Sequence, residues 1–390
     1  MPVNTLSFNQ LSTVLGEIVS QASGQSVITP VTSGDFVSVA QTGLLTGYDP
    51  LMTAISQVLS RTIFSIRPYN RKFGGLMTDE IRYGNHVRKL QTVDKPFEDD
   101  SRLGLVDGES IDQYTVNKPE LLQTNFYGAN VYQKSLTIYR DQLDSAFSSP
   151  DEFGRFIAMI MQNASDQIEQ AHESMARMTL ANFIGGKVAG DTKNVIHLVT
   201  EYNDVTGLTL TSDTVKQPEN FAAFTRWMFS RIKNLSDLMQ ERTVNYHINV
   251  TGKPIMRHTP RRNQKIYLSS LEMNAIDATV LSQTFHTEFL RVADYEPVTF
   301  WQSIDSPDGI QVKPTYMAPA GTLTTSAETV TVANILGVIF DEEAAGITTV
   351  NQWSASSPFN AKGGYSNIFW HFTDRYWNDF TENGIVLLLD

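Results

Sequence analysis

The 390-residue chain contains no cysteine. This absence excludes disulfide scaffolds, thiolate metal sites, thiol nucleophiles and cysteine-based redox switches. Long apolar runs are also missing, since a run such as residues 385–389 falls far below the ~20 residues that span a bilayer. The amino terminus lacks a basic segment followed by an apolar one. We therefore expect no secretory signal, synthesis in the cytoplasm and no membrane contact.

Basic residues are scarce overall, with 30 Lys and Arg against 42 Asp and Glu and a formal net charge of −12. This balance argues against a dedicated nucleic-acid-binding protein, although contact at one local patch stays possible. Hydrophobic residues make up 41% of the chain, enough for an ordinary core. The length predicts two or three packed units.

The first 60 residues contain no Lys or Arg and only three acids. We interpret residues 1–60 as an amino-terminal arm. Apolar residues between Leu6 and Ile18 share one face of a short helix. Residues 20–47 indicate loop or extended chain, and Asp49 with Pro50 begins a second short helix.

Charge then switches sign twice. Residues 61–89 carry seven basic side chains and two acids, whereas residues 94–120 carry eight acids and three basic side chains. Strand-like segments at residues 81–90 and 111–116 flank this region, which predicts a long two-armed excursion. Each arm can reach about 60 Å, whereas a compact body of this length has a radius of gyration of ~21 Å. An extended excursion must leave its own body; a surface hairpin folded back on the body is the alternative.

The clearest element is a helix that begins after Ser149, where Pro150 and Glu152 complete a strong amino-terminal cap. Apolar residues recur at helical spacing from residue 153 to a stop at Gly185–Gly186, about 50 Å away. Its other face indicates solvated charges, with Glu173 and Arg177 spaced to pair. Glu169 and His172 match half of a di-iron motif, but no second half occurs, so we expect no metal site.

Mixed elements follow, and they predict a small α+β unit. A helix begins at Pro218, residues 246–250 alternate as in a strand, residues 266–268 and 310–312 form short strands, and a helix follows Ser269. No acid occurs from residue 243 to 271, which leaves five cations uncompensated locally. They are Lys253, Arg257, Arg261, Arg262 and Lys265. These cations can meet a neighbour's acids or phosphates, or simply remain solvated.

The last 60 residues are rich in strands, at residues 334–340, 365–372, 375–380 and 385–389. Because the chain ends in an apolar strand, we expect that end to be tied into a sheet. Catalytic motifs are missing: no P-loop, zinc-protease helix or nucleophile elbow occurs. His371 lies in an aromatic strand, which favours a structural role. We expect no catalytic residue and no cofactor.

This order of elements resembles the major capsid proteins of tailed bacteriophages, which have the Hong Kong 97 fold. Two sequence phrases are similar to those of smaller phage capsid proteins: TPRRNQKIYL at residues 259–268 and NAKGGYSNIFW at residues 360–370. The resemblance implies an α+β fold with an amino-terminal arm at 1–60 and an extended loop with flanking strands at 61–140. It also implies a peripheral domain with a spine helix at 141–241 and 326–390, and an axial domain at 242–325.

The resemblance further implies a virion shell subunit that is assembled in the bacterial cytoplasm. Copies would form pentamers and hexamers of an icosahedral head, with a separate scaffolding protein and a portal as partners. The inner face would contact packaged double-stranded DNA non-specifically. Residues expected at subunit interfaces are Arg82, Arg88, Lys89, Glu98, Asp99, Asp100, Arg257, Arg261, Arg262 and Lys265. An encapsulin-like compartment and a soluble enzyme with an unrecognised site are the alternatives.

Overall fold

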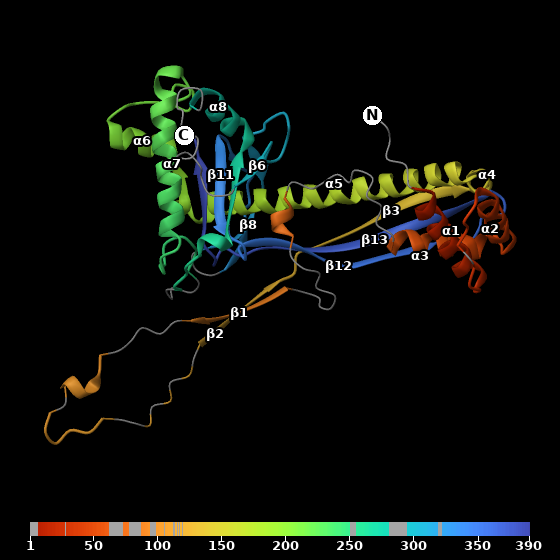
Figure 1. Cartoon of the computed structure of the whole chain (residues 1–390). Coiled ribbons are helices and arrows are strands. Elements are labelled where there is room, and N and C mark those ends of the chain that lie inside the picture. The colour runs from red at the N-terminus through yellow and green to blue at the C-terminus, as the bar shows by residue number, and fades with distance from the viewer. Residues whose placement is uncertain are drawn as a thin grey trace.

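The computed structural model describes residues 7–27, 29–61, 73–77, 87–93, 99–104, 106–111, 114, 116, 118, 120–249, 255–280, 295–318 and 322–390. One long helix, α5 (Pro150–Gly190), runs the length of the body and carries the other elements on its two halves (Figure 1). Its 41 residues make it about 60 Å long. Ser149 caps it through a hydrogen bond from the Glu152 amide, as predicted.

Three helices and a three-stranded sheet cover the amino-terminal half of α5. The helices are α1 (Phe8–Ser23), α2 (Ser33–Leu45) and α3 (Tyr48–Arg61), and the short α4 (Arg140–Ala146) precedes α5. The sheet has the order β12 (Ala345–Ser356), β13 (Tyr365–Asn378), β3 (Ala129–Tyr139), and all its pairs are antiparallel. Their apolar side chains share one core, in which Phe36 of α2 packs edge-on against Phe153 of α5.

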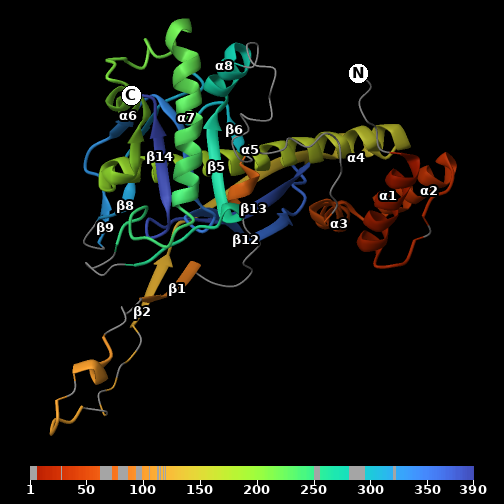
Figure 2. The ribbon, with the colours of Figure 1, turned by 60° about the vertical axis from the view of Figure 1, so that its left-hand side comes forward.

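A five-stranded sheet lies against the other half of α5. Its order is β4 (Val195–His197), β14 (Gly384–Leu388), β11 (Ile335–Asp341), β5 (Gln264–Ser269) and β6 (Glu296–Val298). The helices α6 (Leu198–Thr206), α7 (Pro218–Leu238) and α8 (Ser270–Val280) pack on its opposite face (Figure 2). Strands β11 and β14 are therefore buried on both faces, which explains their continuous apolar sequences.

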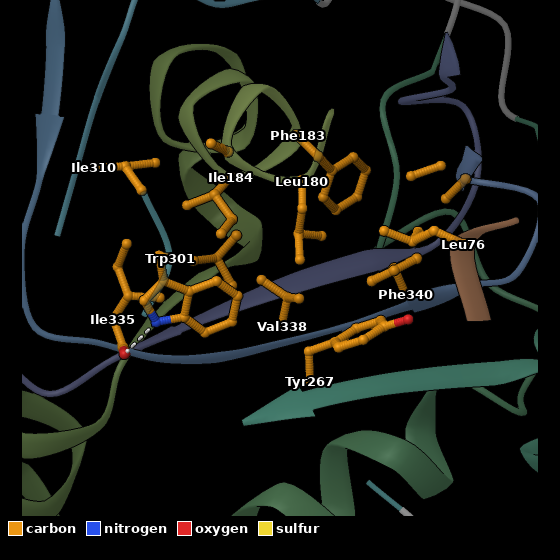
Figure 3. Packing of buried hydrophobic residues seen from close by; sticks show 14 of the residues in the cluster. Leu76, Leu180, Phe183, Ile184, Tyr267, Trp301, Ile310, Ile335, Val338 and Phe340 are labelled. Carbon is orange, nitrogen blue, oxygen red and sulfur yellow. Dashed lines mark hydrogen bonds between the residues drawn. The ribbon is translucent and has the colours of Figure 1, made fainter. Parts of the chain in front are cut away.

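Aromatic and aliphatic side chains fill the layer between α5 and this sheet. Figure 3 shows Leu180, Phe183 and Ile184 of α5 facing Val338 and Phe340 of β11. The indole of Trp301 donates a hydrogen bond of 3.1 Å to the Ile335 carbonyl. The chain's last strand, β14, pairs with β11 and β4, so the predicted anchoring of this end in a sheet is confirmed.

Smaller elements connect these layers. They are the 3-10 turns η1 (Gly74–Leu76), η2 (Ser101–Gly104), η3 (Thr192–Asn194) and η4 (Arg261–Asn263), and the two-stranded pairs β7 (Ile310–Val312) with β10 (Val330–Val332) and β8 (Thr315–Met317) with β9 (Leu323–Thr325). The predicted strands at 266–268 and 310–312 are confirmed.

The loop predicted at residues 20–47 is wrong. Residues 33–45 form α2, which begins with a capping box between Thr32 and Asp35. Phe36 and Ala40 are fully buried, so α2 packs onto α1, α3 and α5 instead of trailing as extended chain. Its Ser- and Gly-rich sequence has low helix propensity, and tertiary packing outweighs that preference.

The helix stop predicted at Gly185–Gly186 is also wrong, because α5 continues to Gly190. These glycines permit close packing. A Cβ at Gly186 would lie 2.5 Å from Phe380 and 2.9 Å from Tyr316, and a Cβ at Gly185 would lie 2.5 Å from Val312.

Residues 246–249 do not form the predicted strand; they are irregular, and the Ile248 amide donates to the Phe380 carbonyl. The two strands predicted at 365–372 and 375–380 are one strand, β13. Strands β12 and β3 were not predicted. Residues 281–289 of the predicted helix face lie outside the described residues.

Candidate subunit-interface site

A hairpin projects from the body below the junction of the two halves. Strands β1 (Val87–Val93) and β2 (Glu120–Phe126) pair antiparallel along their whole length. Figures 1 and 2 agree that β1 and β2 start at the body and that residues 99–104 and 106–111, at the other end of the hairpin, lie away from the rest of the described chain. The excursion therefore leaves its own body, and the folded-back alternative is excluded for these residues. Strand β2 begins at Glu120, later than the segment predicted at 111–116.

One face of β1 is attached to the body through Lys89. Its ammonium lies 2.7 Å from Glu382, 3.0 Å from Asp379 and 3.0 Å from Glu343. Asp379 and Glu382 are buried. Burial opposes the charge on Lys89, but the carboxylates of Asp379 and Glu382 outweigh it and raise the pKa of Lys89 above its usual value.

Gln91 and Arg257 extend this attachment. The Arg257 guanidinium donates to the Gln91 side chain and, over 3.1 Å, to the Thr381 carbonyl, and it lies 3.3 Å from Glu382. The Gln91 amide donates to the Thr381 hydroxyl over 3.4 Å. The turn at residues 379–383 thus holds the base of the hairpin. We call Lys89, Gln91, Arg257, Asp379 and Glu382 the hairpin anchor.

The opposite face of the hairpin carries two exposed leucines among polar side chains. Leu90 on β1 and Leu121 on β2 expose 63% and 69% of their surface. Because Leu90 pairs with Gln123, two residues beyond Leu121, both leucines lie on the same face. Exposed side chains of this size on a projecting element indicate a surface for association.

Eight of the ten predicted interface residues fall into three groups, and the other two, Arg261 and Lys265, belong to the basic loop. Lys89 and Arg257 bond to acids of their own chain in the anchor, which sequence proximity could not reveal. Arg88, Asp99 and Arg262 are exposed, and Asp100 is exposed but pairs with Arg102, which lowers the pKa of Asp100 by hydrogen bonding. Arg82 and Glu98 lie outside the described residues.

Acids from outside the basic loop neutralise part of its charge, which the local sequence could not show. Arg261 pairs with Asp237 of α7, and Arg262 donates to the Asn263 side chain over 3.2 Å. Lys265 is half-buried on β5. The acids that pair with Arg257 and Arg261 are distant in sequence, so local charge counting missed them. Lys253 lies outside the described residues.

The face of α5 predicted to be solvated is largely buried at its centre. Glu173 and Arg177 form the predicted pair, at 2.5 Å, but both are less than 9% exposed. The Arg177 guanidinium also lies 3.7 Å from the centroid of the Phe300 ring. Residues 295–317 cover this part of α5, and the sequence pattern of the helix alone could not show that.

His172 of the proposed metal half-motif lies 3.1 Å from the buried carboxylate of Asp374 on β13. Burial raises the pKa of Asp374, but hydrogen bonds from His172, Tyr132 and Thr349 outweigh it and lower the pKa below its usual value. This cluster ties α5 to the three-stranded sheet. Among the described residues, no group of three or more acids and histidines is arranged to hold a metal ion.

His371 packs against Trp353 with ring centroids 3.9 Å apart, which confirms that it is a packed residue. None of the helices in the described ranges combines the length and apolar character that a bilayer crossing requires. Asp379, Glu382 and Asp374, which matter most to the anchor and to the α5–sheet contact, were not singled out from the sequence. The signal available from the sequence was the presence of these acids within or just after the aromatic segment at residues 365–380.

The long central helix, the sheet packed against it and the projecting hairpin define the class of fold, the Hong Kong 97 type. The chain is similar to a chain in the capsid structure of Staphylococcus phage Andhra, with 13% identity, a TM-score of 0.54, and 84% of this chain and 87% of that chain covered. A second similar chain comes from the structure of the head fiber and inner core protein gp22 of native bacteriophage P68. It is 11% identical, with a TM-score of 0.54 and the same coverage.

The family model for Phi29-like phage major capsid proteins matches residues 15–388. No curated protein sequence matches the chain. The chain belongs to the Phi29-like phage major capsid protein family, and its role is structural, as part of the virion capsid.

Proposed function

We propose that copies of this chain form the pentamers and hexamers of an icosahedral head that encloses double-stranded DNA, and that the hairpin lies over a neighbouring subunit. The observation that carries this proposal is the hairpin itself, which is firmly anchored at its base but projects beyond its own body. An element in that position contributes little to its own fold. It gains contacts only when a second copy approaches.

The surfaces of the hairpin support the same conclusion. Leu90 and Leu121 leave apolar area in water, and burying such area stabilises an interface by about 25 cal/mol per Å². Asp99 and Asp100 place acids toward the far end of the hairpin, where they can meet basic residues of a neighbour. The net charge of −12 suits a container whose contact with DNA must remain weak and non-specific.

The division into arm, extended loop, peripheral domain and axial domain belongs to this proposal, as do assembly in the host cytoplasm, a separate scaffolding protein and a portal. In the proposed arrangement the exposed candidates Arg88, Asp99, Asp100 and Arg262 contact neighbouring subunits. Lys89 and Arg257 act indirectly, because they hold the hairpin in position.

Charge reversal at the hairpin tests the proposal. We expect the combined variant Glu98→Lys, Asp99→Lys and Asp100→Lys to remain folded by circular dichroism but to form no shells by electron microscopy. The charge-matched control replaces three exposed acids of the body, Asp204, Asp213 and Glu219, with lysine. Normal particles from the hairpin variant would contradict the proposed role of the hairpin.

A further inference from the structure

Strand β3 has an open edge that pairs with no other strand in the described part of the chain. It forms the border of the three-stranded sheet and pairs with β13 from Ala129 to Tyr139 without a register shift. Two backbone hydrogen bonds at the ends of this ladder define its pattern: the Tyr376 amide donates to the Gly128 carbonyl over 3.3 Å, and the Arg140 amide donates to the Gly364 carbonyl over 2.9 Å. The two residues that bond to β13 from the ends of β3, Gly128 and Arg140, both have even numbers.

In an antiparallel ladder, hydrogen-bonded pairs alternate with pairs that are not bonded to each other. The even-numbered residues of β3 therefore direct their amides and carbonyls toward β13, and the odd-numbered residues direct theirs to the opposite edge. Val131, Gln133, Ser135 and Thr137 have no backbone partner at that edge within the described part of the chain. All four are exposed.

This edge lacks the features that usually prevent pairing with another chain. Such features include proline, bulges, several charges or a covering element. Strand β3 has no proline, and its only charged side chain, Lys134, bonds to Gln167 of α5. The edge of β12, by contrast, lies against α3 and forms a bridge from Ile347 to Met77. At 11 residues, β3 is the longest open edge among the described strands.

We propose that the open edge of β3 receives β1 of the projecting hairpin of a second copy, which joins the sheet as an added strand. This inference rests on the proposed function, because it requires copies packed side by side. Strand β1 has seven residues and pairs only with β2 in the described part of the chain, and it forms the base of the hairpin that projects from the body (Figure 1).

Side chains favour the same partner. Leu90 and Leu121 are exposed on one face of the hairpin, and Val131 exposes 72% of its surface on β3. Adding β1 beside β3 would place these apolar side chains next to each other on a continuous five-stranded sheet. The backbone bonds would supply affinity, and the leucines would favour one register.

Amide hydrogen exchange tests the pairing directly. We expect the amides of Val131, Gln133, Ser135 and Thr137 to exchange at least about tenfold more slowly in assembled particles than in unassembled subunits. The even-numbered amides of Tyr132 and Lys134 provide an internal control, because β13 already protects them. Shells in which the odd-numbered amides exchange as fast as in free subunits would overturn this inference but leave the proposed function intact. Failure to form shells under any assembly condition would overturn the proposed function itself.

Cysteine crosslinking identifies the occupant, since the natural chain has no cysteine to interfere. Particles assembled from a mixture of Leu90→Cys and Gln133→Cys chains should form inter-subunit crosslinks with a short bismaleimide. Particles that contain only Gln133→Cys should form none. Crosslinks in that single variant would mean that β3 meets β3 of another copy, and protected amides without crosslinks in the mixture would mean a different partner. Either result overturns the assignment of β1.

A proline substitution distinguishes the contribution of the backbone amide from that of the side chain. Ser135→Pro removes an outward amide without removing a bond to β13, whereas Ser135→Ala keeps the amide and removes the hydroxyl. We expect the proline variant to fold and to lose most of its particle yield, and the alanine variant to assemble normally. Equal yields would overturn the inference. If the proline variant does not fold, hydrogen exchange on the natural chain remains decisive.

Discussion

Lys89 is held by three carboxylates, two of which are buried and closer than 3.1 Å. Removing this cation would leave Glu382 with Arg257, at 3.3 Å, and Asp379 with only the electrostatic attraction of Lys187 among the cations of the described residues. A buried charge that loses its partner costs about 3–5 kcal/mol, far more than the net value of the intact pair. Lys89 therefore offsets the free-energy cost of burying the charges of Asp379 and Glu382 at the base of the hairpin.

We expect Lys89→Met to lower the free energy of unfolding of the subunit by about 3–5 kcal/mol, as measured by urea denaturation. Arg88→Met on the exposed face of the same strand is the matched control, and we expect it to change the free energy by no more than about 0.5 kcal/mol. Similar losses in both variants would show that the anchor contributes no more than the exposed face does.

His247 gives the subunit a predictable pH dependence. Its imidazole is 3% exposed and lies 2.7 Å from the Ile255 carbonyl and 3.1 Å from the Asn383 side chain. Burial lowers the pKa of His247, the nearby cations Arg257 and Lys187 also lower it, and the two hydrogen bonds oppose them. The unfolded chain therefore binds more protons than the folded chain below pH 6.5, and stability falls as the pH drops from there toward the folded pKa.

We expect the free energy of unfolding to decrease below pH 6.5 by up to about 1.4 kcal/mol per pH unit. His247→Gln should remove this decrease, because glutamine does not titrate. His258→Gln at an exposed position should retain it. Denaturation curves measured between pH 5 and 8 decide the matter, and a natural chain that is equally stable across that range contradicts the assignment.

At the scale of elements, strong local signals were read correctly. The cap at Ser149 and the apolar repeat after it placed α5, and the continuous apolar segments at 334–340 and 385–389 placed β11 and β14. The charge switch after residue 61 indicated the hairpin. These features depend on the residues of one segment, which explains why the sequence alone revealed them.

Elements that depend on distant contacts were missed. Helix α2 forms because Phe36 meets Phe153 of α5, and β3 lies at a sheet border whose alternation is too polar to stand out. In the site, the partners of Lys89 are separated from it by more than 250 residues. No pattern within a short window contains that information, so the anchor required the structure.

Glycines in the second half of α5 supply a test of this packing. Gly186→Ala would raise helix propensity but place a Cβ 2.5 Å from Phe380. Overpacking should prevail and lower stability by about 1–3 kcal/mol. Gly154→Ala, near the start of α5, meets only the flexible Leu11 side chain at 3.1 Å, and we expect it to be neutral or stabilising. Thermal denaturation compares the two, and a more stable Gly186→Ala variant would contradict close packing at that position.

At the scale of the whole molecule, α5 joins two separately packed ends. Residues 8–61 and the three-stranded sheet form one core, and the five-stranded sheet forms two more with α5 and with α6–α8. The hairpin and the exposed edge of β3 lie outside these cores. The three hydrophobic cores are thus formed within one subunit, whereas the exposed face of the hairpin and the edge of β3 have groups that only a second copy can cover. Substitutions at those surfaces should change assembly and leave folding intact.

The loop at residues 257–265 allows capsomer contacts to be distinguished from DNA contacts. Arg261 and Arg262 are exposed, and the Arg261–Asp237 pair at the surface contributes about 0.2–1 kcal/mol, so Arg261→Glu with Arg262→Glu should fold. We expect this double variant to reduce the yield of shells, while the shells that do form retain DNA. The control is Arg226→Glu with Lys233→Glu on the exposed face of α7.

Electron microscopy gives the shell yield, and nuclease-protected DNA per particle gives retention. If the loop meets acids of a neighbour, charge reversal introduces like-charge repulsion at that contact, and the shell count falls before the DNA content does. If the loop instead faces the packaged DNA, reversal repels phosphates, and intact shells lose their DNA. The first outcome lowers the number of shells and the second lowers the DNA content of each shell, so the two can be distinguished. Intact but empty particles would assign Arg261 and Arg262 to the inner surface and contradict their placement between capsomers.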